Sequence, residues 1–225
     1  MTDRVYSAEF HAADGAEAWR VLPEGAHAFF RTDSFAASAR FVGAIADLLG
    51  DGLAPHVDIR ADGVSVLLRA FKGEQFGLDR DDLDLARRIG AAARDLGLAA
   101  DPSAIQSLLI IPGATERATI MPFWQAVLEY VPRPDSPDED LVDSHERNAP
   151  FWFEEMEDLR ADGAGTMHIV VWVPWDLAES RVQAGIAAGG RLVRHNVEEG
   201  FWTLADPAGN EVDIATTTGP PAASS

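Results

Sequence analysis

The segment Leu204-Ala205-Asp206-Pro207-Ala208-Gly209-Asn210-Glu211-Val212-Asp213 is the stretch on which our interpretation of the fold depends. It connects two predicted strands, residues 201–204 and 212–216. The elements before it follow a simple order along the chain: a strand at 167–173, a helix at 177–188, the turn Gly189-Gly190 and a strand at 191–195. Residues 165–217 therefore predict one unit of a strand, a helix and three further strands, written βαβββ.

The same order of elements occurs earlier in the chain. An apolar strand at 105–111 is followed by a predicted helix at 118–130 and a strand at 151–156. Residues 104–160 and 165–217 thus read as two copies of one unit with weak identity, and such a repeat predicts that the copies share one core. The acidic stretch 132–143 holds three prolines, so we expect it to be a solvated loop that adds solubility.

Two motifs in this half resemble a known superfamily. The residues from Trp202 to Asn210 fit the pattern Trp-x-Leu-x-Asp-Pro-x-Gly-Asn, and Gly189-Gly190-Arg191-Leu192-Val193 fits the turn after the second helix. The half resembles the vicinal-oxygen-chelate superfamily of glyoxalases, bleomycin-resistance proteins and dioxygenases, and within it the glyoxalase-like type. This resemblance implies a cupped sheet built from two βαβββ units, with a small-molecule site on its concave face.

The resemblance also implies a divalent metal site. The superfamily takes ligands from the first and last strands of each unit, which correspond here to Gln106, Glu154, His168 and Asp213. Such nitrogen and oxygen donors suit Zn, Ni, Mn or Fe, and the ion stabilises an oxyanion of the chelated substrate. Asp213 departs from the pattern, because catalytic members carry Glu there. A register shift of one residue would exchange Glu154, also a catalytic candidate, for Glu155.

Strand alternation supports part of this assignment and leaves alternatives open. His168 shares one strand face with Trp172. His168 could equally be a half-buried, hydrogen-bonded histidine, and Gln106 a polar residue at a strand start. Trp152, Trp172 and Trp202 could line an apolar pocket for a flat ligand, or belong to an ordinary core. A metal-free protein that binds or sequesters a ligand, such as an antibiotic, is therefore the alternative to a metalloenzyme.

The first 98 residues predict a small α+β domain of order ββαββα. The predicted elements are two short strands within 19–30, a helix at 34–49, a hairpin of strands 56–60 and 64–71, and a helix with Asp79 as its N-cap. On the first of these helices we expect Phe35 and Ile45 to face inward. Gly97 and the turn Asp101-Pro102-Ser103 end this domain.

This first domain is similar to the pterin-4a-carbinolamine dehydratases. The similarity lies in Trp19, the Phe35-x5-Phe41 helix start, the hairpin start Pro55-His56-Val57-Asp58 and the segment Gly77-Leu78-Asp79-Arg80-Asp81-Asp82. Active dehydratases use three histidines for acid–base chemistry, but Pro55 and Gly73 occupy the places of two of them. The resemblance implies the fold and a similar groove with a degenerate motif. His56 and Asp58 are then the candidate catalytic residues of a 4a-hydroxytetrahydrobiopterin dehydratase-like lyase.

Composition limits the possible partners. The 225 residues include 18 basic and 37 acidic side chains, which gives a net charge of −19 and an isoelectric point near 4.5. Nucleic acid and anionic membranes would repel such a chain. Cysteine is absent, which excludes disulfides and cysteine-bound metals, and Lys72 is the only lysine. Because we find no apolar leader and no apolar stretch of about 18 residues, we expect a cytoplasmic protein.

We therefore expect two α+β domains, residues 1–98 and 104–217, and a disordered tail at 218–225. The expected function is that of a small-molecule lyase or isomerase of the glyoxalase-like type that uses a divalent metal. The alternatives are a metal-free ligand-binding protein and a dehydratase-like lyase acting through His56. The expected partners are a small-molecule substrate or ligand and, by analogy with both families, a second copy in a homodimer.

Overall fold

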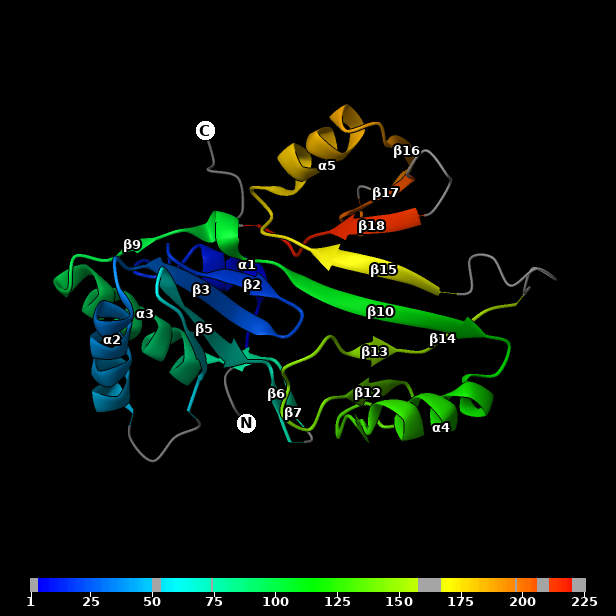
Figure 1. Cartoon of the computed structure of the whole chain (residues 1–225), viewed down its shortest axis with the longest axis horizontal. Helices are drawn as coiled ribbons and strands as arrows, with labels where there is room; N and C mark the ends of the chain where they lie inside the picture. The colour runs from blue at the N-terminus through cyan, green and yellow to red at the C-terminus, as the bar shows by residue number, and fades with distance from the viewer. Residues whose placement is uncertain are drawn as a thin grey trace. The chain divides into compact units, whose positions relative to one another are not determined.

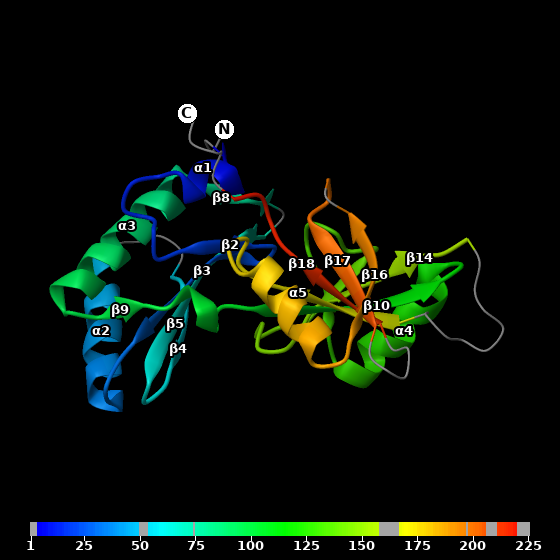
Figure 2. The same cartoon turned by 90° about the horizontal axis from the view of Figure 1, so that it is seen from above.

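The computed structural model describes residues 4–49, 54–73, 75–157, 167–196, 198–205 and 211–219. The chain divides into two compact units (Figures 1 and 2). Unit 1 comprises Met1–Ile105, Pro174–Asp176 and Thr217–Ser225, and unit 2 comprises Gln106–Val173 and Leu177–Thr216. Both units contain helices and sheets, which confirms the mixed α+β class. The predicted turn at 162–165 and all of the predicted tail except Thr218 and Gly219 lie outside the described residues.

Unit 1 combines an antiparallel sheet with two long helices. Its elements are β1 (Arg4–Val5), α1 (Ser7–His11), β2 (Arg20–Leu22), β3 (Gly25–Arg31), α2 (Phe35–Leu48), β4 (His56–Ile59), β5 (Gly63–Arg69), β6 (Phe71–Lys72), β7 (Gln75–Phe76), β8 (Leu78–Asp79), α3 (Arg80–Asp95), β9 (Ala99–Ala100) and the 3-10 turn Pro102–Ala104. The main sheet has the order β2-β3-β5-β4, and β9 also pairs with β3.

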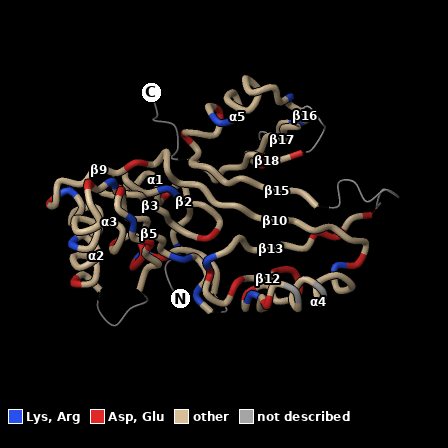
Figure 3. Tube along the Cα trace, in the orientation of Figure 1, with Lys and Arg blue, Asp and Glu red and all other residues tan. Residues whose placement is uncertain are grey.

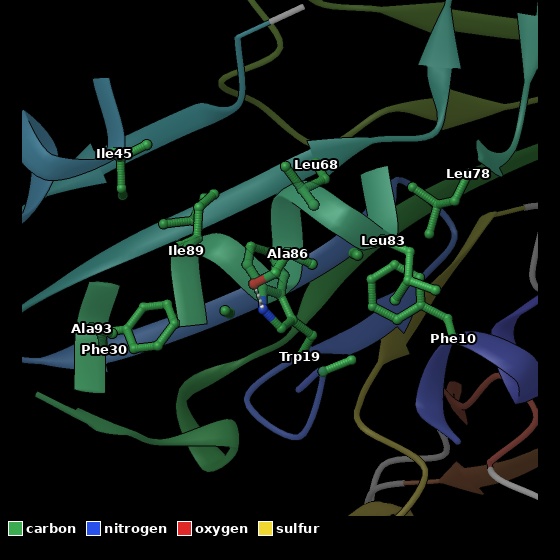
Figure 4. Packing of buried hydrophobic residues seen from close by; sticks show 14 of the residues in the cluster. Phe10, Trp19, Phe30, Ile45, Leu68, Leu78, Leu83, Ala86, Ile89 and Ala93 are labelled. Carbon is green, nitrogen blue, oxygen red and sulfur yellow. Dashed lines mark hydrogen bonds between the residues drawn. The ribbon is translucent and has the colours of Figure 1, made fainter. Parts of the chain in front are cut away.

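The core of unit 1 lies between this sheet and the helices α2 and α3. Trp19, Phe30 and Ile89 are almost completely buried in it (Figure 4), and Phe41 is equally buried. The indole Nε1 of Trp19 donates a hydrogen bond to the backbone carbonyl of Ala86 at 3.0 Å. The one polar atom of this large side chain is therefore satisfied inside the core, as burial requires.

Ser34 caps helix α2, and the buried face of this helix begins farther along the chain than we expected. The side chain of Ser34 accepts a hydrogen bond from the backbone N–H of Ala37 at 3.2 Å. Phe35, which we expected to face inward, is 57% exposed, so that prediction is wrong. Phe35 is the first residue of the helix, and the buried face consists of later residues that include Phe41 and Ile45.

Helix α3 begins with a reciprocal cap. The Asp79 carboxylate accepts the backbone N–H of Asp82 at 3.1 Å, and the Asp82 carboxylate accepts the backbone N–H of Asp79 at 2.8 Å. The N-cap predicted at Asp79 is confirmed. Each carboxylate satisfies a donor that the first turn of a helix leaves unpaired.

The single lysine, in β6, joins this cap to that strand. Lys72 Nζ lies 3.0 Å from Asp79 Oδ2 and 2.5 Å from Asp82 Oδ2. Burial opposes ionisation of Asp79, but the Lys72 ammonium and the N–H of Asp82 bring its pKa below the ordinary value. Burial also lowers the pKa of Lys72, and the hydrogen bonds to Asp82 and Asp79 outweigh it, so the net shift is upward. The pairing therefore stabilises the charged forms of Lys72 and Asp79.

We predict that Lys72→Met lowers the free energy of unfolding by about 1–3 kcal/mol, because it leaves two neighbouring carboxylates without their cation. The loss should be present at neutral pH. It should diminish as the pH falls, first through the pKa of Asp82, which burial raises, and then through the lowered pKa of Asp79, since protonation removes these ion pairs in the wild type too. Urea unfolding at several pH values measures it.

The matched control is Arg80→Met, which removes the exposed ion pair between Arg80 and Glu9. Exposed pairs contribute about 0–1 kcal/mol, so this variant should unfold close to the wild type. Equal stability of Lys72→Met and wild type at pH 7 would contradict the prediction.

Unit 2 consists of two consecutive halves. The first contains β10 (Ser107–Ala114), α4 (Arg117–Leu128), β11 (Val131–Pro132), β12 (Asp140–Val142), β13 (Phe151–Trp152) and β14 (Glu154–Glu155). The second contains β15 (Met167–Trp172), α5 (Ala178–Ala187), β16 (Arg191–Asn196), β17 (Phe201–Ala205) and β18 (Glu211–Ala215). All of these strands belong to one sheet of order β11-β12-β13-β10-β15-β18-β17-β16, and β14 also pairs with β10.

The two halves have the same strand connectivity. In each half the first strand pairs in parallel with strands from the end of that half, β10 with β13 and β14 and β15 with β18, and the remaining pairs within the half are antiparallel. The halves meet at β10 and β15, which run antiparallel over six residue pairs from Ser107–Trp172 to Pro112–Met167. This central pair makes one continuous sheet from two similar parts (Figure 1).

The sheet of unit 2 has a face packed against helices and a face without them. Val173, Leu204 and Ile214 pack with α5, and Phe151 and Phe153 pack with residues of α4. A third cluster contains no described helix residue, and we call its side of the sheet the open face. Its members are Leu109, Ile111, Trp152, Val170, Trp172, Phe201 and Ala215.

The acidic stretch 132–143 is not simply a solvated loop. Asp140 is 3% exposed and Asp143 is 6% exposed. Arg133 pairs with Asp135 at 2.7 Å and with Asp140 at 3.0 Å, and the stretch contributes to β11 and β12. Our expectation was therefore wrong for the end of the stretch, because Arg133 pairs with the buried Asp140 and because Asp143 accepts hydrogen bonds from the backbone of His145 and the side chain of Asn148. Acidic residues are nevertheless distributed over both units (Figure 3).

None of the helices in the described part of the chain is long and apolar enough to span a membrane.

Candidate functional site

His168 and Asp213 lie close together on the open face. Ile111 of β10 is opposite His168, and Val170 of β15 is opposite Asp213. Since alternate residues of a strand share a face, His168, Val170 and Asp213 all project to the same side. The atoms His168 Nε2 and Asp213 Oδ2 are 3.9 Å apart. This is the one pair among the four expected metal ligands for which the structure records a side-chain contact.

Asp213 accepts a hydrogen bond from a residue of the neighbouring strand, and we did not identify this residue from the sequence. Thr203 of β17 is opposite Asp213, and its Oγ1 donates a hydrogen bond to Asp213 Oδ1 at 2.5 Å. Thr203 is 5% exposed and the Asp213 side chain 15%. The antiparallel pairing of β17 with β18 puts residues 203 and 213 opposite each other, so the spacing of the two predicted strands was the available signal.

Glu154 shares the face of His168 but lies farther along the sheet. It is opposite Gly113, two residues beyond Ile111 on β10, whereas Glu155 is opposite Ala114 and faces the other side. The register thus assigns Glu154 to the open face. Because β10 separates β14 from β15, the backbones at Glu154 and His168 are about 10 Å apart or more.

Gln106 is not brought to the other three residues. It precedes β10, and strand alternation puts it on the helix-packed face together with Leu108. Its Oε1 accepts a hydrogen bond from Nη1 of Arg181 in α5 at 3.1 Å. Gln106 also lies at the end of β10 away from Ile111, the partner of His168, so neither its face nor its position suits a shared site.

These donors do not form a prearranged divalent-metal site. Catalytic zinc sites, for example, have three protein ligands around the ion. Here His168 and Asp213 make a pair, Asp213 already accepts the Thr203 hydroxyl, and Glu154 is separated from them by a strand. Within the described residues no group of three or more histidine, aspartate or glutamate side chains is close enough to hold a metal.

The structure brings two of the three candidate tryptophans together. Trp152 and Trp172 belong to the open-face cluster with Phe201. Trp202, the next residue along β17, points to the helix-packed face and stacks on His195 with ring centroids 4.7 Å apart. Adjacent residues of a strand face opposite sides, so Phe201 takes the position that the sequence interpretation gave to Trp202.

Two hydrogen-bond donors lie at this aromatic cluster. Arg194 is opposite Thr203 and therefore on the open face, and its guanidinium carbon is 4.9 Å from the ring centroid of Phe201. The indole Nε1 of Trp172 is buried and has no hydrogen-bond partner among the described residues. The face thus combines aromatic rings, a cation and an unpaired donor with the His168–Asp213 pair.

The candidate residues of unit 1 are arranged less favourably for chemistry. His56 and Asp58 both lie on β4, but the Asp58 carboxylate is exposed and accepts two hydrogen bonds from Arg60, at 2.8 and 3.1 Å. A cavity of about 400 Å³ in unit 1 is lined by residues that include Arg31 and Arg40. Neither His56 nor Asp58 is among its described lining residues.

Comparison with known proteins bears on unit 2. Residues 110–215 match the family profile of the glyoxalase-like domain. The glyoxalase-like resemblance predicted for the carboxy-terminal half is thereby confirmed. The dehydratase resemblance of residues 1–98 stays a prediction. No curated protein matches the chain.

Several solved structures are similar to about half of the chain. The NAD-dependent benzaldehyde dehydrogenase from Legionella pneumophila is 14% identical over 49% of this chain and 99% of that one, with a TM-score of 0.38. A glyoxalase/bleomycin resistance protein/dioxygenase superfamily member from Vibrio splendidus 12B01 is 12% identical over 50% and 100%, with a TM-score of 0.33. A protein from Agrobacterium tumefaciens is 18% identical over 49% and 96%, with a TM-score of 0.24. Scores this low support no argument about this chain.

We predict that Thr203→Val lowers the free energy of unfolding by about 1.5–3 kcal/mol, because Asp213 loses its buried donor while the side-chain shape is kept. Thr203→Ser keeps the hydroxyl and should cost only the lost methyl group, about 1 kcal/mol. Chemical unfolding of the two variants gives the comparison. If Thr203→Val is as stable as wild type, the hydrogen bond does not support this site.

Proposed function

We propose that the open face of unit 2 binds a small organic molecule with a flat, partly apolar body. The observation that carries this proposal is the cluster of Trp152, Trp172 and Phe201 on a sheet face that no described helix residue covers. Sites for small molecules combine apolar and aromatic walls with a few polar groups that fix orientation. His168, Asp213 and Arg194 supply such groups beside the rings.

The same face supports a lyase- or isomerase-like reaction as its chemistry. His168 and Asp213 provide an imidazole and a carboxylate within 4 Å of each other, and these are the groups that most often transfer protons in such reactions. Thr203 holds Asp213 and so orients the pair. The glyoxalase-like family match supports this unit as the one that acts on the ligand.

The residues of the open face support a metal-dependent form of this function less well than a metal-free form. The donor set lacks Gln106, and Glu154 lies across a strand, so we derive no step through an ion. We predict that protein dialysed against Zn²⁺, Ni²⁺, Mn²⁺ or Fe²⁺ retains well under one ion per chain, with His168→Ala unchanged. Elemental analysis measures the content. Stoichiometric metal that is lost in His168→Ala would instead establish the metalloenzyme.

The dehydratase-like alternative is also supported less well. It depends on His56 and Asp58, and the Asp58 carboxylate is engaged by Arg60. The homodimer and the cytoplasmic location expected from the sequence stay predictions.

Binding of a neutral flat probe tests the proposed function. Using 2-naphthamide and isothermal titration calorimetry, we predict that Trp172→Ala lowers the affinity at least tenfold, about 1.4 kcal/mol, because it removes a wall of the open face. Trp202→Ala is the matched control, since the same side chain is removed from the opposite face, and it should change the affinity less than twofold. Circular dichroism verifies that both variants are folded. Equal effects of the two substitutions, or no binding by wild type, would refute the proposal.

A further inference from the structure

The open face carries two groups, Arg194 and the indole of Trp172, for which the described residues provide no ion-pair or hydrogen-bond partner, respectively. We propose that its ligand is a planar organic anion whose acid group pairs with Arg194 and whose oxygen accepts a hydrogen bond from Trp172. This inference rests on the proposed function and adds the chemical class of the ligand. It follows from the strand register, from the surroundings of Arg194 and from the unpaired indole of Trp172.

A β-bulge brings Arg194 to the open face. Leu192 is opposite Leu204, but the next recorded pair is Arg194 with Thr203, so Val193 is an extra residue in β16. In a regular ladder Val193 would be opposite Thr203, and Arg194 would face the helix-packed side. Bulges commonly redirect a side chain next to a functional site. Here the bulge replaces an apolar side chain by a cation.

Arg194 is available to pair with an acid group. Its guanidinium lies over the ring of Phe201, and within the described residues it forms no ion pair. The nearby carboxylate of Asp213 is already engaged by Thr203 and faces His168. In a chain with a net charge of −19, a cation held against an aromatic ring provides the local attraction that an anionic ligand requires.

Trp172 provides the second donor beside the same rings. Trp172 and Phe201 are both opposite Ala215, one from each neighbouring strand, and all three belong to the open-face cluster. The buried Nε1 of Trp172 lacks a partner among the described residues, whereas the buried Nε1 of Trp19 has one. Buried donors are normally satisfied, so an oxygen of the ligand fits this position. Both unused groups are donors, which favours a carboxylate over a cation.

A pair of probes that differ only in charge tests the inference. We use 2-naphthoate and 2-naphthamide, which share the ring system and a carbonyl oxygen, and measure both by isothermal titration calorimetry. Wild type should bind the carboxylate about tenfold more tightly than the amide, and this preference should fall as salt is added. Arg194→Gln should lower the affinity for 2-naphthoate about tenfold and leave that for 2-naphthamide within twofold.

Two further variants separate the roles of the two donors. Arg181→Gln removes the same charge from helix α5, which packs on the opposite side of the sheet, and should leave the carboxylate preference intact. Trp172→Phe keeps an aromatic ring but removes the Nε1 donor, so it should weaken both probes by a similar factor.

The outcomes distinguish the two proposals. Equal affinity for the two probes in wild type, with no effect of Arg194→Gln, overturns the anion inference and leaves the proposed function standing. Binding of neither probe overturns both. Equal losses in Arg194→Gln and Arg181→Gln show a general effect of net charge, which also overturns the assignment of Arg194.

Discussion

The antiparallel pairing of β10 with β15 is the constraint on which the architecture of unit 2 depends. It joins two halves of like connectivity into one sheet, and its register, with Ile111 opposite His168, assigns each side chain to one of two faces. Successive residues alternate between these faces, so a slip of one residue would move His168 and Trp172 to the helix-packed side. The register of β15 with β18 puts Asp213 and Ala215 on the same side of the sheet as His168 and Trp172, so these residues share the open face.

The arrangement of charged side chains in this protein depends on short-range pairing and not on the net charge of the chain. Lys72 joins two carboxylates at the start of α3, and Arg133 allows Asp140 to be buried. On the open face Thr203 holds Asp213 through a neutral hydrogen bond. Within the described residues Arg194 has no anionic partner. The open face therefore carries a local positive charge at Arg194, although the net charge of the chain is −19.

Sequence patterns that involve only neighbouring residues were sufficient to predict much of the fold. Helical spacing and cap chemistry indicated the helix after Asp79, and alternating patterns indicated strands close to β10, β15 and β17. They failed where burial depended on distant partners. Phe35 satisfies the helical pattern but is the first residue of the helix and is 57% exposed. The acidic stretch 132–143 has the composition of a solvated loop, and only the structure shows that Arg133 pairs with Asp135 and Asp140. Thr203 lacks any signal apart from its hairpin spacing to Asp213.

The sequence by itself determined the mixed α+β class, the repeated order of elements after residue 104 and the glyoxalase-like character of that half, because these depend on periodicity and local motifs. Only the tertiary structure decided which candidate residues meet. Gln106 and Trp202 fall on the helix-packed face, whereas His168, Asp213, Phe201 and Trp172 share the open face. The reason is geometric. The sequence specifies the residue types, but the side of the sheet to which a strand residue points depends on the register of the strands, and the bulge at Val193 changes that register by a single residue.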